Sequence, residues 1–276
     1  MLHFRAIVLF LAGLISASAN SAELAASTTI RIGGSGGALA TMQILGQAFN
    51  KIHPNVSVVI VPSLGSGGGI KAMLAGAIDL AISGRALKDT ERAQGALATE
   101  YARTPFVFAT GMRNSVSAIT THELVKIYTG ETRTWPDGKP LRLVLRPENE
   151  SDMDIVKSLS PKMNQAVKTA LAREGMIMAM TDQDSADNLE NIPGAIGTTT
   201  LAQIISEQRA LKPLTLNGAT PSLAALAEGT YPYFKPLFMV TRPKPNPVTQ
   251  AFSSFVRSAE GRQILAKNGQ STTSVK

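Results

Sequence analysis

Apolar residues recur at two different spacings along the first hundred residues. The segments 28–32, 56–61 and 77–83 are short runs of strand-forming residues bounded by polar or glycine-rich stretches. Apolar residues three and four positions apart predict a helix after each of the first two runs: Leu39, Met42, Leu45 and Phe49 in one, Ile70, Met73 and Leu74 in the other. Strands that alternate with helices in this way are typical of an α/β fold with a mainly parallel sheet.

A glycine-rich turn joins each of the first two predicted strands to its helix. The turns are Gly33–Gly37, with Ser35 at the centre, and Gly65–Gly69, with Ser66 in second place. The first amides of a helix have no internal partner and lie at the positive end of its dipole, so both turns are suited to hold an anion. Both are equally compatible with ordinary tight turns. Because the carboxyl ends of parallel strands share one edge of a sheet, we expect the two turns to converge there.

The alternation continues to the C-terminus with longer polar connections. Strands are predicted at 104–110 and 236–243, and strand-loop-helix units at 141–159, 175–190 and 193–208. Thr120 and Glu123 have the spacing of a capping box that begins a helix extending to Tyr128. The segment 248–267 is predicted to be one closing amphipathic helix.

Residues 1–19 have the pattern of a secretory signal peptide. A short start with His3 and Arg5 precedes the apolar run 6–15 and the small-residue site Ala17-Ser18-Ala19. The run is too short to span a bilayer, and no later segment is long and apolar enough to do so. No cysteine follows it to carry a lipid anchor. We therefore expect an exported, periplasmic protein that is not lipid-anchored.

Composition narrows the possible functions. The chain contains no cysteine, which excludes disulfides, zinc–thiolate sites and thiol nucleophiles. Its 44% hydrophobic content is enough for one large domain or two lobes with packed cores. The net charge of +7 favours anionic partners, but the basic residues are scattered rather than clustered with aromatic residues. Nucleic-acid binding is therefore not expected.

Several motifs in a fixed order resemble those of one known family. They are GGSGGALATM, GSGGGIKAMLAGAIDLAISGRALKD, LVKIYTGETRTWPDG, PGAIG, YPYFKPLFMV and FSSFVRSAEGRQILAKNG. Over nearly the whole mature chain, the sequence resembles the periplasmic phosphate-binding proteins of ABC importers, which have the type II periplasmic binding protein fold. The resemblance implies two α/β lobes, each a mainly parallel sheet flanked by helices, joined by two crossing hinge strands. It places lobe I at 28–103 and 237–276, and lobe II at 104–236.

The resemblance also implies a set of ligand-binding residues, some of which depart from the family pattern. The matching positions are Ser35, Gly36, Gly37 and Ala38 in the first turn, Ser66 and Gly67 in the second, Ser83 and Arg85 after the third strand, and Arg146 and Ser151 in lobe II. Gly84 stands where many phosphate binders place an aspartate that accepts a proton of phosphate. In lobe II the family's glycine and threonine beside the serine are absent.

Acidic residues surround Ser151 in the segment 148–154. They are Glu148, Glu150, Asp152 and Asp154. Two carboxylates aimed at a partly buried phosphate would repel it by several kcal/mol. Three interpretations remain: the acids face solvent, one of them accepts a ligand proton, or the ligand is not phosphate. An acidic first turn that complements a helix dipole is the simplest explanation.

Enzymatic readings of the motifs find less support. The turn Gly33–Gly37 matches the pattern of a serine-hydrolase elbow at Ser35, but only His53 and His122 remain in the mature chain, at a helix end and in a capping turn. Lys71 is followed by Ala72, so the second turn is not a nucleotide-binding loop. The aspartates near Asp184 lack the glycine and glutamate of a calcium loop. Trp135, before a Pro-Asp-Gly turn, is better explained as a core residue than as a ligand-stacking one.

The sequence therefore predicts a non-catalytic solute-binding protein without cofactor or bound metal. Its ligand would be phosphate or a related small oxyanion, captured between the two lobes and passed to an ABC permease in the inner membrane. A monomer is expected for this architecture. Two alternatives remain: a sensor or binder of another solute, such as a zwitterion whose cationic group contacts Glu150 or Asp152, and a serine hydrolase that uses Ser35.

Overall fold

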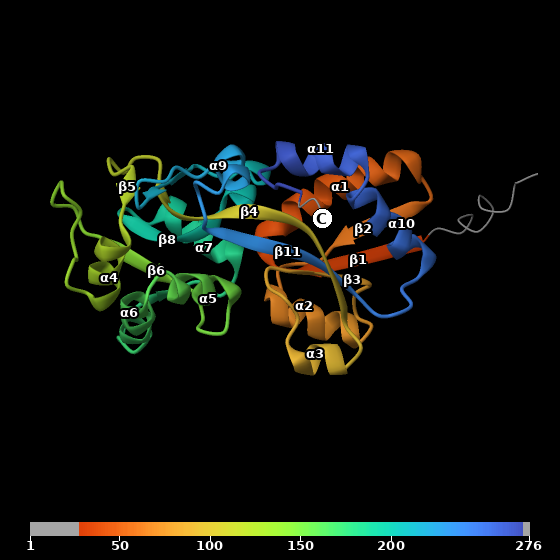
Figure 1. Ribbon diagram of the computed structural model, residues 1–276, viewed down its shortest axis with the longest axis horizontal. Coiled ribbons are helices and arrows are strands. Elements are labelled where there is room, and N and C mark those ends of the chain that lie inside the picture. Colours follow the sequence, from red (N-terminus) through yellow and green to blue (C-terminus); the bar gives the residue numbers. More distant parts are fainter. Residues whose placement is uncertain (1–27, 273–276) are drawn as a thin grey trace, which may run out of the picture.

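One mixed sheet runs through the whole molecule. The computed structural model describes residues 28–272; the predicted signal peptide, residues 1–19, lies outside the described residues. The sheet has nine strands in the order β2-β1-β3-β11-β4-β8-β6-β7, with β9 paired to β4. Its two ends are parallel, and β4 (Leu97–Gly111) and β11 (Phe234–Thr241) cross the middle as an antiparallel pair (Figure 1). The predicted α/β class is confirmed.

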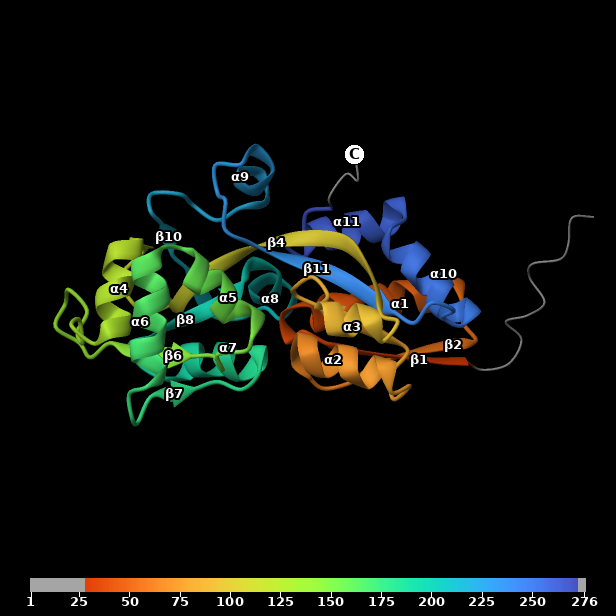
Figure 2. The ribbon, with the colours of Figure 1, turned by 60° about the horizontal axis from the view of Figure 1, so that its bottom comes forward.

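The first end of the sheet and its helices form lobe I. Its parallel strands are β1 (Thr28–Gly34), β2 (Val56–Ile60) and β3 (Leu80–Ser83). A single 3₁₀ turn, η1 (Gly36–Ala38), leads into α1 (Leu39–Ile52), and α2 (Gly65–Leu74) follows β2. Figures 1 and 2 show α1, α10 (Pro247–Val256) and α11 (Ala259–Lys267) on one side of the sheet, and α2 and α3 (Asp89–Ala93) on the other.

The other end of the sheet forms lobe II. Its strands β8 (Ala195–Thr200), β6 (Arg142–Leu145) and β7 (Ile177–Met178) are parallel, and β9 (Leu211–Pro213) pairs with β4. A separate two-stranded sheet consists of β5 (Ala118–Ile119) and β10 (Thr215–Leu216). The helices are α4 (Thr121–Thr129), α5 (Ser151–Ser158), α6 (Pro161–Leu171), α7 (Asp182–Asn191), α8 (Leu201–Ser206) and α9 (Leu223–Glu228).

Several local predictions are confirmed. The side chain of Thr120 accepts a hydrogen bond from the amide of Glu123, whose carboxylate in turn accepts one from the amide of Thr120, so the predicted capping box begins α4. Trp135 is buried, and its indole N–H donates to the carbonyl of Gly194. It is therefore a core residue, as expected.

The predicted closing helix 248–267 is wrong as a single element. The chain forms α10 and α11, because Ser258 begins a new helix: its hydroxyl accepts a hydrogen bond from the amide of Gly261 at 3.1 Å. Several strands also differ from their predicted bounds. β4 extends from Leu97 rather than Thr104, β3 begins at Leu80 rather than at residue 77, and β11 covers Phe234–Thr241 rather than 236–243.

The apolar core is divided in the same way as the sheet. Two buried clusters lie in lobe I, one around Ile30, Phe49 and Phe252 and one around Ile70. A third and larger cluster lies in lobe II and includes Phe106 and Tyr128. The two lobes therefore pack separately on either side of the crossing strands, although their boundaries, 28–103 with 237–276 and 104–236, stay a prediction.

The pairing of the crossing strands is irregular at one point. Phe234 faces Pro105 and the register continues evenly to Leu237, then shifts before Phe238. A shift of this kind bends a strand and increases its twist. The irregularity lies on the lobe I side of Lys235, which is important for the site described below.

Helix α2 approaches β1 closely at a glycine. A Cβ added at Gly69 would lie 2.6 Å from the Cα of Gly34, whereas at Gly67 the nearest atom would be 3.6 Å away, in the side chain of Arg85. The close approach holds the start of α2 beside the first glycine turn.

We therefore expect opposite effects from two neighbouring substitutions. Gly69→Ala should lower the free energy of unfolding by about 1–3 kcal/mol because the helix must move away from the strand. Gly67→Ala should raise it by up to about 1 kcal/mol because alanine is the better helix former. Urea denaturation of both variants measures the difference; equal effects would contradict the close packing at Gly69.

Candidate functional site

The loops after β1, β2 and β3 meet at the carboxyl edge of lobe I, as predicted. The amide of Ser35 donates to the carbonyl of Ile82 at 2.8 Å, and the amide of Gly84 donates to the hydroxyl of Ser66 at 2.9 Å. Both serines are buried. The amides of Gly36 and Gly37 are the donors of the first turn that face lobe II, because both lie beside the carboxylate of Asp182.

Lobe II contributes Arg146 and Ser151 to the same place. Arg146 follows β6 and is only 1% exposed; its Nη1 donates to the carbonyl of Ala179, while its Nε has no partner among the described residues. Ser151 begins α5, and its hydroxyl would be 3.1 Å from a Cβ added at Gly84 of lobe I. Both residues therefore lie at the contact between the lobes.

A buried lysine, which the sequence reasoning missed, lies at the centre of this contact. Lys235 on β11 is 2% exposed, and its Nζ lies 2.5 Å from Oδ1 of Asp152 and 3.5 Å from Oδ1 of Asp182. A Cβ at Gly84 would be 2.3 Å from Cε of Lys235, so the glycine leaves room for the lysine. The alternation of β11 was the available signal, because it places Lys235 on the same buried face as Leu237.

Two of the acidic residues are buried against this lysine. Asp152 accepts hydrogen bonds from Lys235 and from the hydroxyl of Thr198. Burial alone would raise the pKa of Asp182, but Lys235, Arg146 and the backbone amides of Gly37 and Gly36 outweigh it and hold that pKa below its usual range. The pKa of Lys235 is raised, because the two aspartates outweigh its burial. Asp182 and Lys235 are therefore ionised at neutral pH.

Glu150 completes the group, which we call the interlobe cluster: Arg146, Glu150, Asp152, Asp182 and Lys235. The carboxylate of Glu150 lies 3.7 Å from Nη2 of Arg146, and it would be 2.8 Å from a Cβ added at Gly65, the first residue of α2. Burial raises the pKa of Glu150 above its usual range despite the nearby arginine. The cluster contains three carboxylates and two cations. Glu148 and Asp154, in contrast, are exposed.

Four other predicted residues lie at the edge of the cluster or outside it. The hydroxyl of Ser83 donates to the carbonyl of Arg85, within its own loop. The guanidinium of Arg85 makes two hydrogen bonds to Glu91, at 2.7 and 2.9 Å, which together with the Glu91 charge raise the pKa of Arg85. Gly67 is exposed. Ala38 is buried beneath the first turn.

The histidines are not arranged around Ser35 as in a hydrolase. His53 follows the C-terminus of α1, whose 14 residues correspond to about 21 Å, and its ring lies 4.3 Å from that of Phe49. His122 lies in the first turn of α4 in lobe II. No hydrogen bond joins either histidine to Ser35 within residues 28–272.

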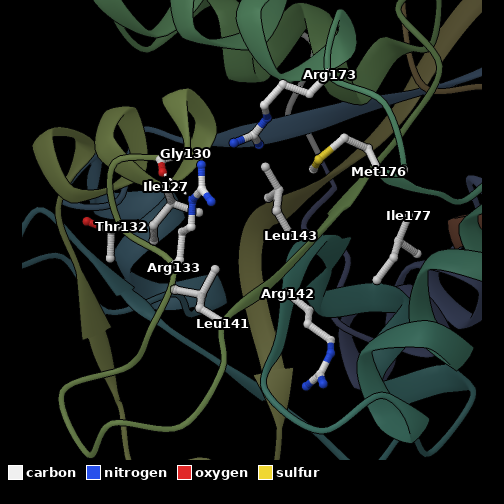
Figure 3. Close-up of a pocket in the computed structure, with 11 residues that line it drawn as sticks. Ile127, Gly130, Thr132, Arg133, Leu141, Arg142, Leu143, Arg173, Met176 and Ile177 are labelled. Carbon is white, nitrogen blue, oxygen red and sulfur yellow. Dashed lines mark hydrogen bonds between the residues drawn. The ribbon is translucent and has the colours of Figure 1, made fainter.

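A cavity of about 230 Å³ lies beside the amino end of β6. Arg133, Arg142 and Arg173 line it, and Figure 3 shows the guanidinium groups of Arg133 and Arg173 near Gly130. Arg133 donates to the carbonyl of Gly130, which ends α4. Positive charge at a helix C-terminus is favourable, which explains Arg133 and Arg173 beside Gly130, while Arg142 donates to the carbonyl of Pro193. None of the predicted site residues lines this cavity.

The comparison with a family model identifies the fold. Residues 19–260 match the model described as the PBP superfamily domain. The chain belongs to this family. The resemblance drawn from the ordered motifs is thus confirmed. Within the PBP superfamily, the phosphate-binding protein PstS of Borreliella burgdorferi is 27% identical over 251 residues, which cover 87% of this chain and 88% of the relative.

Solved structures of similar fold support the two-lobed arrangement. A substrate-binding protein from Clostridium perfringens, solved with bound phosphate, has a TM-score of 0.76 at 21% identity, over 89% of this chain and 99% of that one. A phosphate transport receptor from Vibrio cholerae has a TM-score of 0.62 at 19% identity, over 88% and 100% of the two chains. The predicted type II fold is confirmed.

Across residues 28–272, the helices are too short or too polar to cross a bilayer.

The buried pair of Lys235 and Asp152 should dominate local stability. Lys235→Met leaves Asp152 as an unpaired buried charge and should lower the free energy of unfolding by about 3–5 kcal/mol. The double variant Lys235→Met, Asp152→Asn should recover much of this loss because residue 152 then carries no charge, while Asp182 keeps Arg146 and two backbone amides. Urea denaturation of the two single variants and the double variant gives the coupling energy; additive effects would contradict a direct pair.

The raised pKa of Glu150 predicts a pH-dependent effect of Glu150→Gln. Below the pKa of an unfolded glutamate both states are protonated, so the variant and the wild type should be equally stable. As the pH rises through the higher folded-state pKa, ionisation penalises only the folded wild type, and the variant should become the more stable protein. Thermal unfolding at pH 4 and pH 7 measures this difference; a variant that is less stable at pH 7 would contradict it.

Proposed function

We propose that this protein captures phosphate or a related small oxyanion between its two lobes and delivers it to an ABC importer. Two glycine turns of lobe I and Arg146 with Ser151 of lobe II supply amides, hydroxyls and a guanidinium suited to a tetrahedral anion. The relatives are named as phosphate-binding proteins, and one structure of the same fold contains phosphate. These observations support an oxyanion as the ligand.

Arg146 is the observation that carries this proposal. It is the largest fully buried side chain in the described residues. Its Nη1 donates to the carbonyl of Ala179, but its Nε lacks an acceptor there. Burying an unpartnered charged donor is costly. A bound oxyanion provides the missing acceptor.

The fold provides a way to close over such a ligand. The lobes have separate cores and are joined by β4 and β11, so that bending of these strands changes the separation of the lobes. A ligand held by lobe I at Gly36 and Gly37 would meet Arg146 when the lobes approach. The closed form that contains the ligand is the one that the permease would recognise.

The remaining parts of the proposal follow from the same architecture. We expect no catalysis, because no hydrogen bond joins Ser35 to His53 or His122 within residues 28–272, as a serine hydrolase would require. It is exported by the signal peptide at 1–19, acts in the periplasm as a monomer and does not bind nucleic acid. The membrane permease is its protein partner.

The acidic residues favour a second candidate ligand of the same site. The interlobe cluster has one more carboxylate than cations, and Glu150 has its nearest cation at 3.7 Å. A zwitterion such as an aminoalkylphosphonate would offer its oxyanion to the glycine turns and its ammonium group to Glu150. Binding of such a phosphonate but not of phosphate would identify this class.

Substitution of Arg146 tests the proposed function. Arg146→Gln removes the charge that the ligand would contact, and the affinity for phosphate should fall by at least about tenfold, as for a lost charged hydrogen bond. Arg142→Gln is the matched control, since Arg142 is exposed at the other end of the same strand. Calorimetric titration of the mature protein with phosphate, sulfate and 2-aminoethylphosphonate measures the affinities.

Wild-type protein that binds none of these compounds would contradict the proposal. To exclude a ligand retained from the cell, the protein is first unfolded in denaturant, dialysed and refolded. Equal loss of affinity in both arginine variants would show that only the general charge matters.

A further inference from the structure

Asp182 of lobe II lies where the proposed function places an anion of the ligand. Its carboxylate faces the backbone amides of Gly36 and Gly37, and its Oδ1 would be 3.8 Å from a Cβ added at Gly37. The residue is 4% exposed. An acidic side chain of one lobe therefore occupies the anion-binding turn of the other.

The groups around Asp182 are those expected to bind an oxyanion. Besides the two amides, Nζ of Lys235 lies 3.5 Å from its Oδ1 and Nη2 of Arg146 lies 4.0 Å from it. Two cations and two amides thus converge on one carboxylate. In this structure the carboxylate of Asp182 is the anion that these donors surround.

Capping of α7 does not require Asp182. Thr181 and Asp184 already form a reciprocal capping box at the start of this helix, with distances of 2.9 and 3.0 Å. Asp182 is the first residue of α7, and its side chain is directed across the lobe contact instead. The next residue, Gln183, also reaches lobe I: its Nε2 donates to the carbonyl of Gly36 at 3.1 Å.

We infer that Asp182 is an internal anion that occupies the glycine turn of lobe I in the ligand-free protein, and that an oxyanion ligand must displace it. The inference rests on the proposed function and adds the residue that sets its selectivity. Because Asp182 belongs to lobe II, separation of the lobes removes it from Gly36 and Gly37 and exposes their amides. The ligand-free protein is then held closed by its own carboxylate.

Competition with Asp182 determines which anions bind. A carboxylate tethered within the same molecule competes at an effective concentration in the millimolar range or above. A free monocarboxylate such as acetate has the same charge and the same two oxygens, so it gains nothing by the exchange. A tetrahedral dianion carries more charge and more acceptor oxygens, and it contacts both cations at once. Asp182 therefore selects dianionic oxyanions over simple carboxylates.

The variant Asp182→Asn tests this competition. If the turn is free about one tenth of the time in the wild type, removal of the competing charge should tighten phosphate binding by about tenfold. Acetate, which should not bind the wild type at millimolar concentration, should bind the variant. Asp154→Asn is the matched control, because it removes the same charge from an exposed side chain of the same lobe, and it should change either affinity by less than about threefold. Repeating the titrations at high salt removes the general charge effect.

The separation of the lobes provides a readout that does not depend on the ligand. The chain contains no cysteine, so Ala93→Cys in α3 and Asn164→Cys in α6 introduce two exposed labelling sites, one on each lobe. The distance between spin labels attached at these two sites, measured by double electron–electron resonance, should be the same in the wild type with and without phosphate. In Asp182→Asn the ligand-free distance should become longer and broader, and phosphate should shorten it again.

The outcomes separate this inference from the proposed function. Unchanged phosphate affinity together with an unchanged ligand-free distance in Asp182→Asn would overturn the inference. A longer distance in that variant without binding of any oxyanion would support the internal anion and refute the oxyanion ligand. If Asp182→Asn does not fold, the wild type decides alone: a ligand-free protein that is open, and that closes only with phosphate, contradicts the inference.

Discussion

The ion pair between Lys235 and Asp152 is the constraint on which the packing of β11, α5 and the loop at Gly84 depends. A lysine that is almost fully buried in a crossing strand must have a carboxylate partner, because an unpaired ammonium in such a place would be very costly. Asp152 belongs to lobe II, so the requirement is met only when α5 lies against the middle of β11. Gly84 of lobe I provides the space for the lysine stem. One buried charge thus determines the relative position of a strand, a helix and a loop.

The same charge explains why the acidic segment around Ser151 is compatible with a family whose named relatives bind phosphate. Taken alone, Glu150 and Asp152 would repel an oxyanion. In the folded protein Asp152 is neutralised by Lys235, and Asp182 is matched by Lys235, Arg146 and two amides, while burial shifts Glu150 toward its neutral form. The electrostatic character of the site therefore belongs to the cluster as a whole and differs from that of any single segment.

Local features of this fold could be predicted from the sequence, whereas contacts between distant segments could not. The capping box at Thr120, the buried Trp135 and the convergence of the loops with Ser35 and Ser66 depend on neighbouring residues or on the general geometry of parallel strands. The break at Ser258 was missed because the apolar periodicity continues across it. Lys235 and Asp182 were missed as site residues because their contacts join distant parts of the chain. Lys235 lies 83 positions from Asp152 and 53 positions from Asp182, and no periodicity connects residues so far apart. Only the buried register of Lys235 within its strand offered a signal.

The register shift between Leu237 and Phe238 interrupts the pairing of the two crossing strands at one point. Deformation of a paired ribbon concentrates where its ladder is interrupted, and here the interruption lies beyond Lys235 toward lobe I. Lys235 and Asp152 lie on the same side of this interruption, so bending there would leave their ion pair intact. A swing of the two halves about this point would therefore keep the ammonium paired throughout.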